Sequence, residues 1–304
     1  MPPSPIGLTT LFRVEYGRLR RKGGPCRGGH PVSSVEYDPM KLAWLNDIHL
    51  NFVSDDKIEV LCRAVDQTLC DAVAIGGDIG EADSVQGYLL QLARRLDRPV
   101  YFVLGNHDFY EGEIAEVRRS VASLRLADAR IRWLPAEGVV SLTGTAALIG
   151  HDGWADGRYA DFMESGFRVA DHDLIADLAG LDKHELFDKV RELGDEAARY
   201  IREALTEAVG WASEIILLTH VSPFREASWY QGRISDDDAL PHFSCKVMGD
   251  VITAIMARQP RAKLTVLCGH THGGGEYSPL PNVHVITGAA SYGYPAVQRT
   301  IEVG

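Results

Sequence analysis

An unbroken apolar run leads directly into a group of polar side chains in the first half of the sequence. Residues 99–104 read Pro-Val-Tyr-Phe-Val-Leu, and Gly105, Asn106, His107 and Asp108 follow at once. Successive apolar residues are typical of a strand covered on both faces, as in the central sheet of an α/β protein. Because ligands of such proteins collect at the carboxyl ends of strands, the segment predicts a functional site. For these residues taken alone, a polar turn is the alternative.

Four further predicted strands run into side chains that can bind a metal. These strands are expected at residues 41–45, 71–75, 214–219 and 264–268. The side chains that follow them are Asp47, His49, Asp78, His220, His270 and His272. Taken singly, each has an ordinary explanation as a helix cap, a turn residue or a core histidine. Accidents would scatter polar residues along the strands, whereas these all follow carboxyl ends, the one edge where they can converge.

Helical periodicity separates the first three strands and indicates how they pair. Apolar stripes predict helices around residues 58–69, 85–96 and 114–124, with Ser54 as the cap of the first. Strand, helix, strand, helix, strand is the signature of parallel βαβ units with right-handed crossovers.

The remainder of the domain has a different character. Residues 130–134, 139–142 and 146–149 predict short strands of a meander rather than a further βαβ unit. A charged helical insert is expected at about residues 155–212, with helices at 183–192 and 196–211. A helix capped by Ser244 and strands at 283–287 and 300–303 complete the expected elements.

The first 38 residues are predicted to be a flexible leader. They are rich in proline, glycine and arginine, a composition that rarely packs into a core. Residues 39–304 then form the folded domain. A basic arm that contacts nucleic acid or a partner is the alternative for the leader.

The chemistry of the strand-end residues predicts two metal ions. Histidine and carboxylate ligate first-row metals, here Mn, Fe or Zn. Seven candidate ligands are too many for one tetrahedral ion and suit two ions about 3.5 to 4 Å apart that share a carboxylate. Two dications, two aspartates and one hydroxide leave the site with a net charge of roughly +1, which would attract a small phosphate ester.

Five motifs resemble, in their order along the chain, those of the calcineurin-like metallophosphoesterases. They are Asp47-x-His49, Gly77-Asp78, Gly105-Asn106-His107-Asp108, a lone His220 and Gly269-His270-x-His272. The resemblance implies an α/β fold of four layers, a sandwich of α/β/β/α type with two mixed sheets between helices. It also implies the metal ligands. One ion would take Asp47, His49, Asp78 and His272, and the other Asp78, Asn106, His220 and His270, so that Asp78 forms the bridge.

This pattern leads to a hydrolytic mechanism. Two metals lower the pKa of a shared water from roughly 15.7 to about 7, and the bridging hydroxide attacks phosphorus in line with the leaving oxygen. The resemblance implies that His107 binds no metal and faces the phosphate, where it would protonate the leaving group. Asp108 would either orient His107 or cap the following turn. The second motif continues to Glu81, unlike the Asp-Arg-Gly of the protein phosphatases, which argues against phosphoprotein substrates.

Loops that leave the carboxyl ends of strands would select the substrate. Arg225 or Arg233 would clamp a phosphate, and Trp154, Trp229 or Tyr230 would stack on a base. The alternative is that the aromatic residues pack the insert on the core and that the arginines are solvated. Tyr292 and Tyr294 are interpreted in the same way as turn packing.

Charge and composition decide among the functional classes. The net charge of −11 disfavours long nucleic acids, because counterion release needs a basic face. Five cysteines without a C-x-x-C pair, no signal peptide and no apolar run long enough to span a membrane favour a cytoplasmic protein with no membrane association. We therefore expect a phosphoesterase for a small phosphorylated substrate. A nuclease of the same fold and a non-catalytic scaffold are the alternatives.

Overall fold

Four apolar segments from the first half of the chain and one from its end form a five-stranded sheet in the computed structural model, which describes residues 39–304. In order across the sheet, its strands are β13 (Val297–Val303), β1 (Met40–Leu45), β2 (Ala72–Gly76), β3 (Val100–Val103) and β4 (Ile131–Trp133). Strands β1 to β4 are parallel to one another, and β13 is antiparallel to β1.

The second half of the chain contributes most of a six-stranded sheet. In order, its strands are β11 (Gly275–Leu280), β12 (Val283–Thr287), β10 (Lys263–Cys268), β7 (Glu214–Thr219), β6 (Ala146–His151) and β5 (Val140–Ser141). The four central strands are parallel, and the two outer strands are antiparallel to their neighbours. A separate hairpin joins β8 (Trp229–Tyr230) to β9 (Arg233–Ile234).

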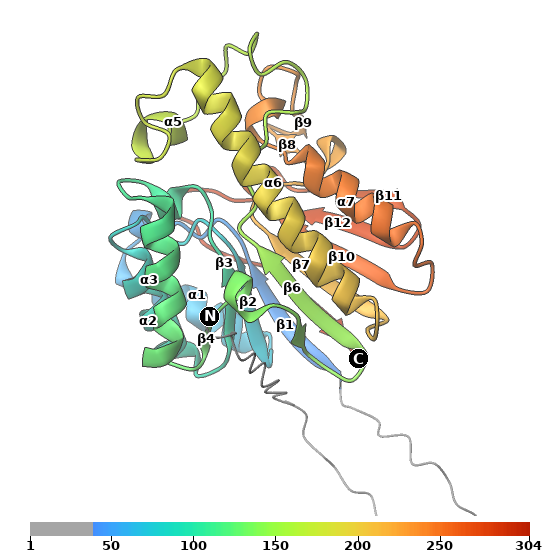
Figure 1. Ribbon diagram of the computed structural model, residues 1–304. Helices are drawn as coiled ribbons and strands as arrows, with labels where there is room; N and C mark the ends of the chain where they lie inside the picture. The colour runs from blue at the N-terminus through green and yellow to red at the C-terminus, as the bar shows by residue number, and fades with distance from the viewer. Residues whose placement is uncertain (1–38) are drawn as a thin grey trace, which may run out of the picture.

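Helices cover the outer face of each sheet (Figure 1). The first sheet carries α1 (Asp55–Gln67), α2 (Val85–Leu96) and α3 (Ile114–Ala127), and the second carries α6 (Lys183–Ala208) and α7 (Lys246–Met256). The shorter elements are α4 (Leu134–Glu137), α5 (Asp171–Leu174), η1 (Leu50–Phe52), η2 (His107–Phe109), η3 (Arg225–Ala227) and η4 (Leu240–His242).

The side-chain alternation of the central strands shows the layering. In β3, Val100 and Phe102 join the apolar cluster formed with α1, α2 and α3. The residues between and after them, Tyr101 and Val103, join a cluster that lies between the two sheets. Strand β7 divides its residues in the same way between the α6 side and the space between the sheets. Three apolar cores therefore separate four layers, which confirms the predicted α/β/β/α sandwich.

The predicted meander is wrong in its first strand. Ile131–Trp133 pairs parallel to β3 and so completes a further βαβ unit, with α3 as its crossover. The other two segments do form an antiparallel pair, β5 and β6. Three residues carry too little periodicity to indicate their partner, and the crossover helix decides it. Strand β11 was not predicted, because its proline and its alternately exposed residues are features of an edge strand.

Helix α6 is continuous from Lys183 to Ala208, where two helices were expected. Gly194 lies inside it, and a side chain there would meet Cβ of Asp156 at 2.5 Å. The glycine thus permits close packing and does not end the helix. Before α6, turns and the short α5 occupy most of the segment expected to be helical.

Two expected helix caps also differ. Ser54 precedes α1, but its side chain makes no capping hydrogen bond, and Leu69 lies beyond the end of that helix with 79% of its surface exposed. Helix α7 begins after Cys245 and not after Ser244.

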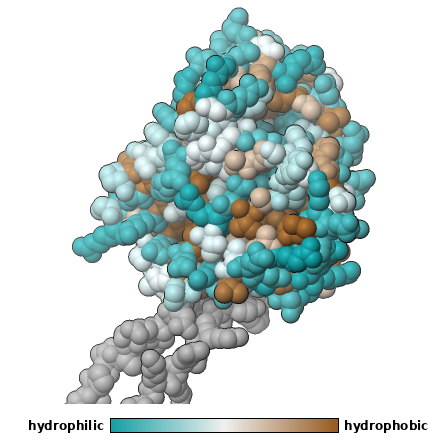
Figure 2. All heavy atoms as spheres, turned by 180° about the vertical axis from the view of Figure 1, so that it is seen from behind, coloured by the Kyte–Doolittle hydropathy of each residue, from teal (hydrophilic) through white to brown (hydrophobic). Residues whose placement is uncertain are grey.

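The predicted leader, residues 1–38, lies outside the described residues. In the described part of the chain, no helix combines the length and the apolar character that crossing a membrane would require. On the face opposite to that of Figure 1, hydrophilic residues cover most of the surface and apolar ones gather near its middle (Figure 2).

Candidate metal centre

Loops that follow five parallel strands supply the side chains of the candidate centre. The structure brings together all seven that the sequence singles out: Asp47 and His49 after β1, Asp78 after β2, Asn106 after β3, His220 after β7, and His270 and His272 after β10. The first five are buried, and the two histidines after β10 are partly exposed. They form two clusters that meet at Asp78.

The first cluster contains Asp47, His49, Asp78 and His272, whose ligand atoms lie within 4.8 Å of one another. Nε2 of His49 lies 3.1 Å from Nε2 of His272 and 3.6 Å from Oδ2 of Asp78. Two nitrogens that bind one tetrahedral ion at about 2.1 Å each lie roughly 3.4 Å apart. The cluster therefore fits an ion between these nitrogens.

In the second cluster, His220 presents a lone pair to two oxygens. Its Nδ1 lies 2.8 Å from the carbonyl oxygen of Gly76, which can only accept, so Nδ1 carries the ring proton. Its Nε2 then faces Oδ1 of Asn106 at 3.0 Å and Oδ1 of Asp78 at 3.4 Å. Three acceptors without a proton between them fit a bound cation.

His270 adds a fourth lone pair at the same place. Its Nε2 lies 3.1 Å from the carbonyl oxygen of His242, which assigns the ring proton to Nε2. Its Nδ1 faces Oδ1 of Asn106 at 2.9 Å. The amide nitrogen of Asn106 donates to Asp171 at 2.7 Å, which fixes the amide so that its oxygen faces the histidines.

Burial sets the protonation states of these groups. It lowers the pKa of His49 to about 3 and that of His220 to about 4, so both imidazoles are neutral at pH 7. Burial, reinforced by the charge of Asp78, raises the pKa of Asp47 well above its usual range. Burial acts in the same direction on Asp78, but interactions with the surrounding histidines, that with His220 foremost, outweigh it and lower the pKa of that carboxyl. His49 and His220 are therefore neutral donors beside crowded carboxylates, as metal binding requires.

The backbone of the centre is strained. Ten non-glycine residues in the described part of the chain have positive φ, and five of them are candidate ligands: Asp47, His49, Asp78, His270 and His272. Left-handed backbone is uncommon outside glycine, and aspartate and histidine are among the residues that tolerate it best. Such strain is concentrated at functional sites, where the surrounding fold holds it.

Two glycines let the loops approach the carboxylates. A Cβ on Gly105 would overlap Oδ1 of Asp78, and one on Gly269 would overlap Oδ2 of Asp47. The backbones after β3 and β10 can therefore pass beside the carboxylates only without a side chain at these positions.

His107 lies beside the first cluster, with its ring centroid 4.7 Å from that of His49. Its backbone N–H donates to Oδ1 of Asp78 at 3.0 Å, which fixes its place. Nδ1 of the ring is buried and has no hydrogen-bond partner among residues 39–304. Nε2 lies 3.4 Å from the hydroxyl of Tyr292 and so points to the open side of the centre.

The carboxylate of Asp108 binds the backbone of two loops and not the ring of His107. It accepts hydrogen bonds of 2.8 to 2.9 Å from the backbone N–H groups of Ile79, Gly80 and Gly105. These bonds join the loop after β2 to the loop after β3. Of the two roles expected for Asp108, the geometry supports turn capping, and within the described residues it makes no bond to His107.

The two arginines expected to clamp a phosphate are paired within their own loop. Arg225 contacts Asp237, and Arg233 lies 3.4 Å from Asp236. Their side chains are 42% and 72% exposed, as expected for solvated ion pairs. The prediction of a free arginine clamp therefore lacks support from the geometry.

The three aromatic residues expected to stack on a base pack against protein. Trp154 is 6% exposed, with its ring 6.0 Å from that of Phe109. Tyr230 lies 5.1 Å from the ring of Phe243, and Trp229 lies against Gly275. The packing alternative describes all three.

Two residues with contacts at the centre were missed or misread in the sequence. Asp171, in the turn-rich segment before α6, binds Asn106 and also accepts from the hydroxyl of Tyr110 at 2.7 Å. Tyr292, interpreted as turn packing, lies over the ring of His49 with a centroid distance of 4.5 Å. Burial raises the pKa of Tyr292 to about 12. In the sequence, the one indication of a role for Tyr292 was its place between serine and glycine after the histidine motifs. The sequence around Asp171 gave no indication of a role.

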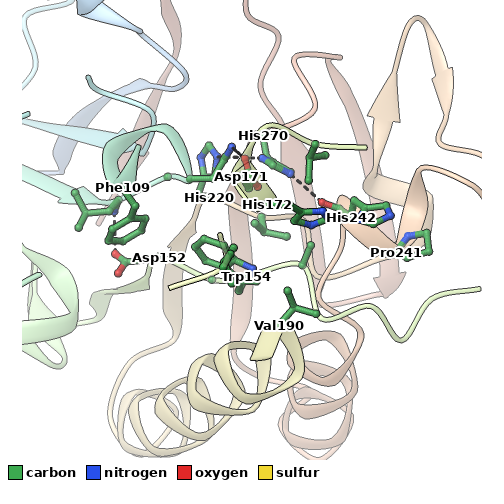
Figure 3. A pocket seen from close by; sticks show the side chains of 18 of the residues that line it. Phe109, Asp152, Trp154, Asp171, His172, Val190, His220, Pro241, His242 and His270 are labelled. Atoms are coloured by element: carbon green, nitrogen blue, oxygen red, sulfur yellow. Dashed lines mark hydrogen bonds between the residues drawn. The ribbon is translucent and has the colours of Figure 1, made fainter. Parts of the chain in front are cut away.

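A small cavity adjoins the second cluster (Figure 3). His220, Asp171 and His270 lie together in its lining, which also includes Trp154 and His242. Its volume of about 20 Å³ has room for roughly one water molecule. The cavity is therefore too small for an organic molecule.

Comparisons with known proteins agree with this geometry. The model of the calcineurin-like phosphoesterase family matches residues 40–274. No curated protein matches the chain.

Two solved structures share the fold. Phosphopantetheinyl hydrolase from Mycobacterium tuberculosis is 15% identical with a TM-score of 0.58, and the match covers 84% of this chain and 90% of that one. A dimetal phosphatase from Danio rerio is 15% identical with a TM-score of 0.54, covering 88% of this chain and 99% of that one. At this identity the likeness concerns the fold alone.

Proposed function

We propose, from the premise that this chain belongs to the calcineurin-like phosphoesterase family, that it hydrolyses a phosphomonoester or phosphodiester of a small substrate with two metal ions. The position of Asp78 carries the proposal. Its Oδ2 lies 3.6 Å from Nε2 of His49, and its Oδ1 lies 3.4 Å from Nε2 of His220. One carboxylate thus faces the lone pairs of both clusters, as a shared ligand would.

Each cluster would hold one ion of Mn, Fe or Zn, since imidazole and carboxylate suit these metals. The first would use Asp47, His49, Asp78 and His272, and the second Asp78, Asn106, His220 and His270. When bound, two such ions supply an activated water and neutralise the charge of a phosphoryl group.

The chain's own residues would position the ester and handle its protons. His107 stands beside the first cluster without a place in either ligand set, and its Nε2 is directed to the open side. From there it would protonate the leaving oxygen as the ester bond breaks. Asp108, through its three backbone hydrogen bonds, keeps the loop that carries His107 in place.

A small substrate is supported by the surroundings of the site. The arginines nearest in sequence to His220 are paired with aspartates, and the chain carries a net charge of −11. A long polyanion would meet little attraction on such a protein, whereas a single phosphate would be attracted by the metals alone.

Metal analysis and ester hydrolysis test the proposal. The purified protein, loaded with Mn²⁺, Fe²⁺ or Zn²⁺, should bind two ions per chain and hydrolyse p-nitrophenyl phosphate or bis(p-nitrophenyl) phosphate. Single-stranded and duplex oligonucleotides should be poor substrates. A protein that binds two ions but hydrolyses neither ester nor any phosphorylated metabolite would contradict the proposal.

A further inference from the structure

The loop between β12 and β13 is tied at two points beside the metal centre. The backbone N–H of Ala290 donates to the carbonyl oxygen of His272 at 3.2 Å. Nζ of Lys57, on α1, donates to the carbonyl oxygen of Gly293 at 2.8 Å. Tyr292 lies between these anchors, so its position is defined by both the β10 loop and α1.

Three rings hold the side chain of Tyr292. Its centroid lies 4.5 Å from that of His49, 5.0 Å from that of His272 and 5.0 Å from that of Phe52. Nevertheless 48% of the residue is exposed, so it forms part of the surface that a substrate meets. Its hydroxyl lies 3.4 Å from Nε2 of His107.

We propose that Tyr292 is a catalytic residue of the hydrolysis proposed above, whose hydroxyl donates a hydrogen bond to the leaving-group oxygen beside His107. This inference rests on the proposed function. The phenol O–H and Nε2–H of His107 each carry a proton, and when an ester is bound both can be directed to the leaving oxygen. Two donors would then stabilise the charge that develops on one oxygen.

The proton balance requires no further reactant. The phosphorus–oxygen bond of the ester breaks, and its electron pair goes to the leaving oxygen. The oxygen of water forms the new bond to phosphorus. The leaving oxygen takes a proton from His107, water releases one in exchange, and Tyr292 keeps its own.

Tyr292→Phe removes the hydroxyl and keeps the ring that packs on His49, His272 and Phe52. Its effect should depend on the leaving group. We expect kcat for phenyl phosphate to fall about 10- to 100-fold, with a smaller loss for p-nitrophenyl phosphate, whose leaving oxygen needs less stabilisation. KM should change little, and the metal content should match the wild type.

Tyr294→Phe is the matched control. Tyr294 lies two residues away in the same loop, is 74% exposed and stacks with Lys57 at 4.6 Å. Removal of the Tyr294 hydroxyl should leave kcat unchanged for both substrates. Equal losses of kcat for both substrates in Tyr292→Phe, or no loss, would overturn the role given to Tyr292.

Binding of inorganic phosphate separates this inference from the proposed function. One oxygen of phosphate takes the place of the leaving oxygen, so calorimetry on the metal-loaded protein should show weaker binding to Tyr292→Phe by about 3- to 10-fold. If the wild type hydrolyses no ester, the proposed function fails. Calorimetry still shows whether the Tyr292 hydroxyl contacts an oxygen of the bound phosphate. Equal phosphate affinity in wild type and variant would refute it.

Discussion

Asn106 and Asp171 are joined by a hydrogen bond of 2.7 Å, although 65 residues separate them in the sequence. The bond runs from the amide nitrogen of Asn106 to a carboxylate that is 6% exposed. The amide oxygen is thereby directed at Nε2 of His220 and Nδ1 of His270. A residue from the segment before α6 thus orients a candidate metal ligand.

Asp171→Asn should weaken one of the two metal sites. An amide in place of the carboxylate no longer compels the Asn106 amide to present its oxygen, and loss of such a supporting contact costs about 10- to 100-fold in metal affinity. Metal titration by calorimetry should show one weakened and one unchanged site. Asp173→Asn is the control, since the side chain of Asp173 is 67% exposed and pairs with Arg168. Loss of affinity in both variants would contradict the assignment.

His107→Ala and Asp78→Ala should separate catalysis from metal binding. The His107→Ala variant lacks the imidazole and should still bind two ions, while its kcat falls about 10²- to 10⁴-fold. Asp78→Ala removes the carboxylate between the clusters and should lose both ions and activity. Elemental analysis beside p-nitrophenyl phosphate hydrolysis gives the two readouts. If His107→Ala also loses its metals, His107 is a ligand and not an acid.

Gly105→Ala should abolish metal binding while leaving the chain folded. Its Cβ would overlap the carboxylate of Asp78, so the loop after β3 must move away from the centre. Gly87→Ala, in α2, has open space around the added methyl and should stabilise the protein by roughly 0.5 to 1 kcal/mol. Urea unfolding and metal analysis of the pair test the difference. Normal metal affinity in Gly105→Ala would show that the loop adapts.

His151 should make the metal-free protein sensitive to acid. It lies at the end of β6, and burial lowers its pKa to about 4. In the unfolded chain its pKa is about 6.5, so between pH 6.5 and pH 4 the unfolded state binds a proton that the native state does not. The stability contributed by neutral His151 is therefore complete above pH 6.5 and is lost as the pH falls towards 4.

The size of this effect is measurable. Between pH 7.5 and pH 5 the shift corresponds to about 2 kcal/mol of unfolding free energy. His151→Gln should lose that part of the pH dependence in urea titrations, and its stability at pH 5 should approach that at pH 7.5 more closely. An unchanged pH dependence in the variant would show that His151 is not the group responsible.

Local pattern determined the parts of the fold that could be predicted. The apolar run before Asn106 indicated β3, and the polar residues after each strand indicated which edge would carry the site, because the ends of parallel strands must converge. The family resemblance added the second sheet and the pairing of the ligands into two sets.

Other features depend on packing that no local pattern encodes. The short strand β4 takes its partner from the crossover through α3. Tyr292 reaches His107 across 185 residues of sequence, because the β12–β13 loop passes the first cluster. Asp171 lies in a segment without periodicity, and only the folded chain shows its bond to Asn106.

The left-handed backbone at five of the ligands restricts how this centre could be redesigned. A change of metal preference is usually sought by exchanging one ligand type for another. At these positions threonine, valine or any other β-branched residue would add conformational cost to the change in chemistry, whereas asparagine would fit the existing loops. Exchanges among aspartate, asparagine and histidine should therefore add the least conformational cost, whereas other ligand types would require new loops around them.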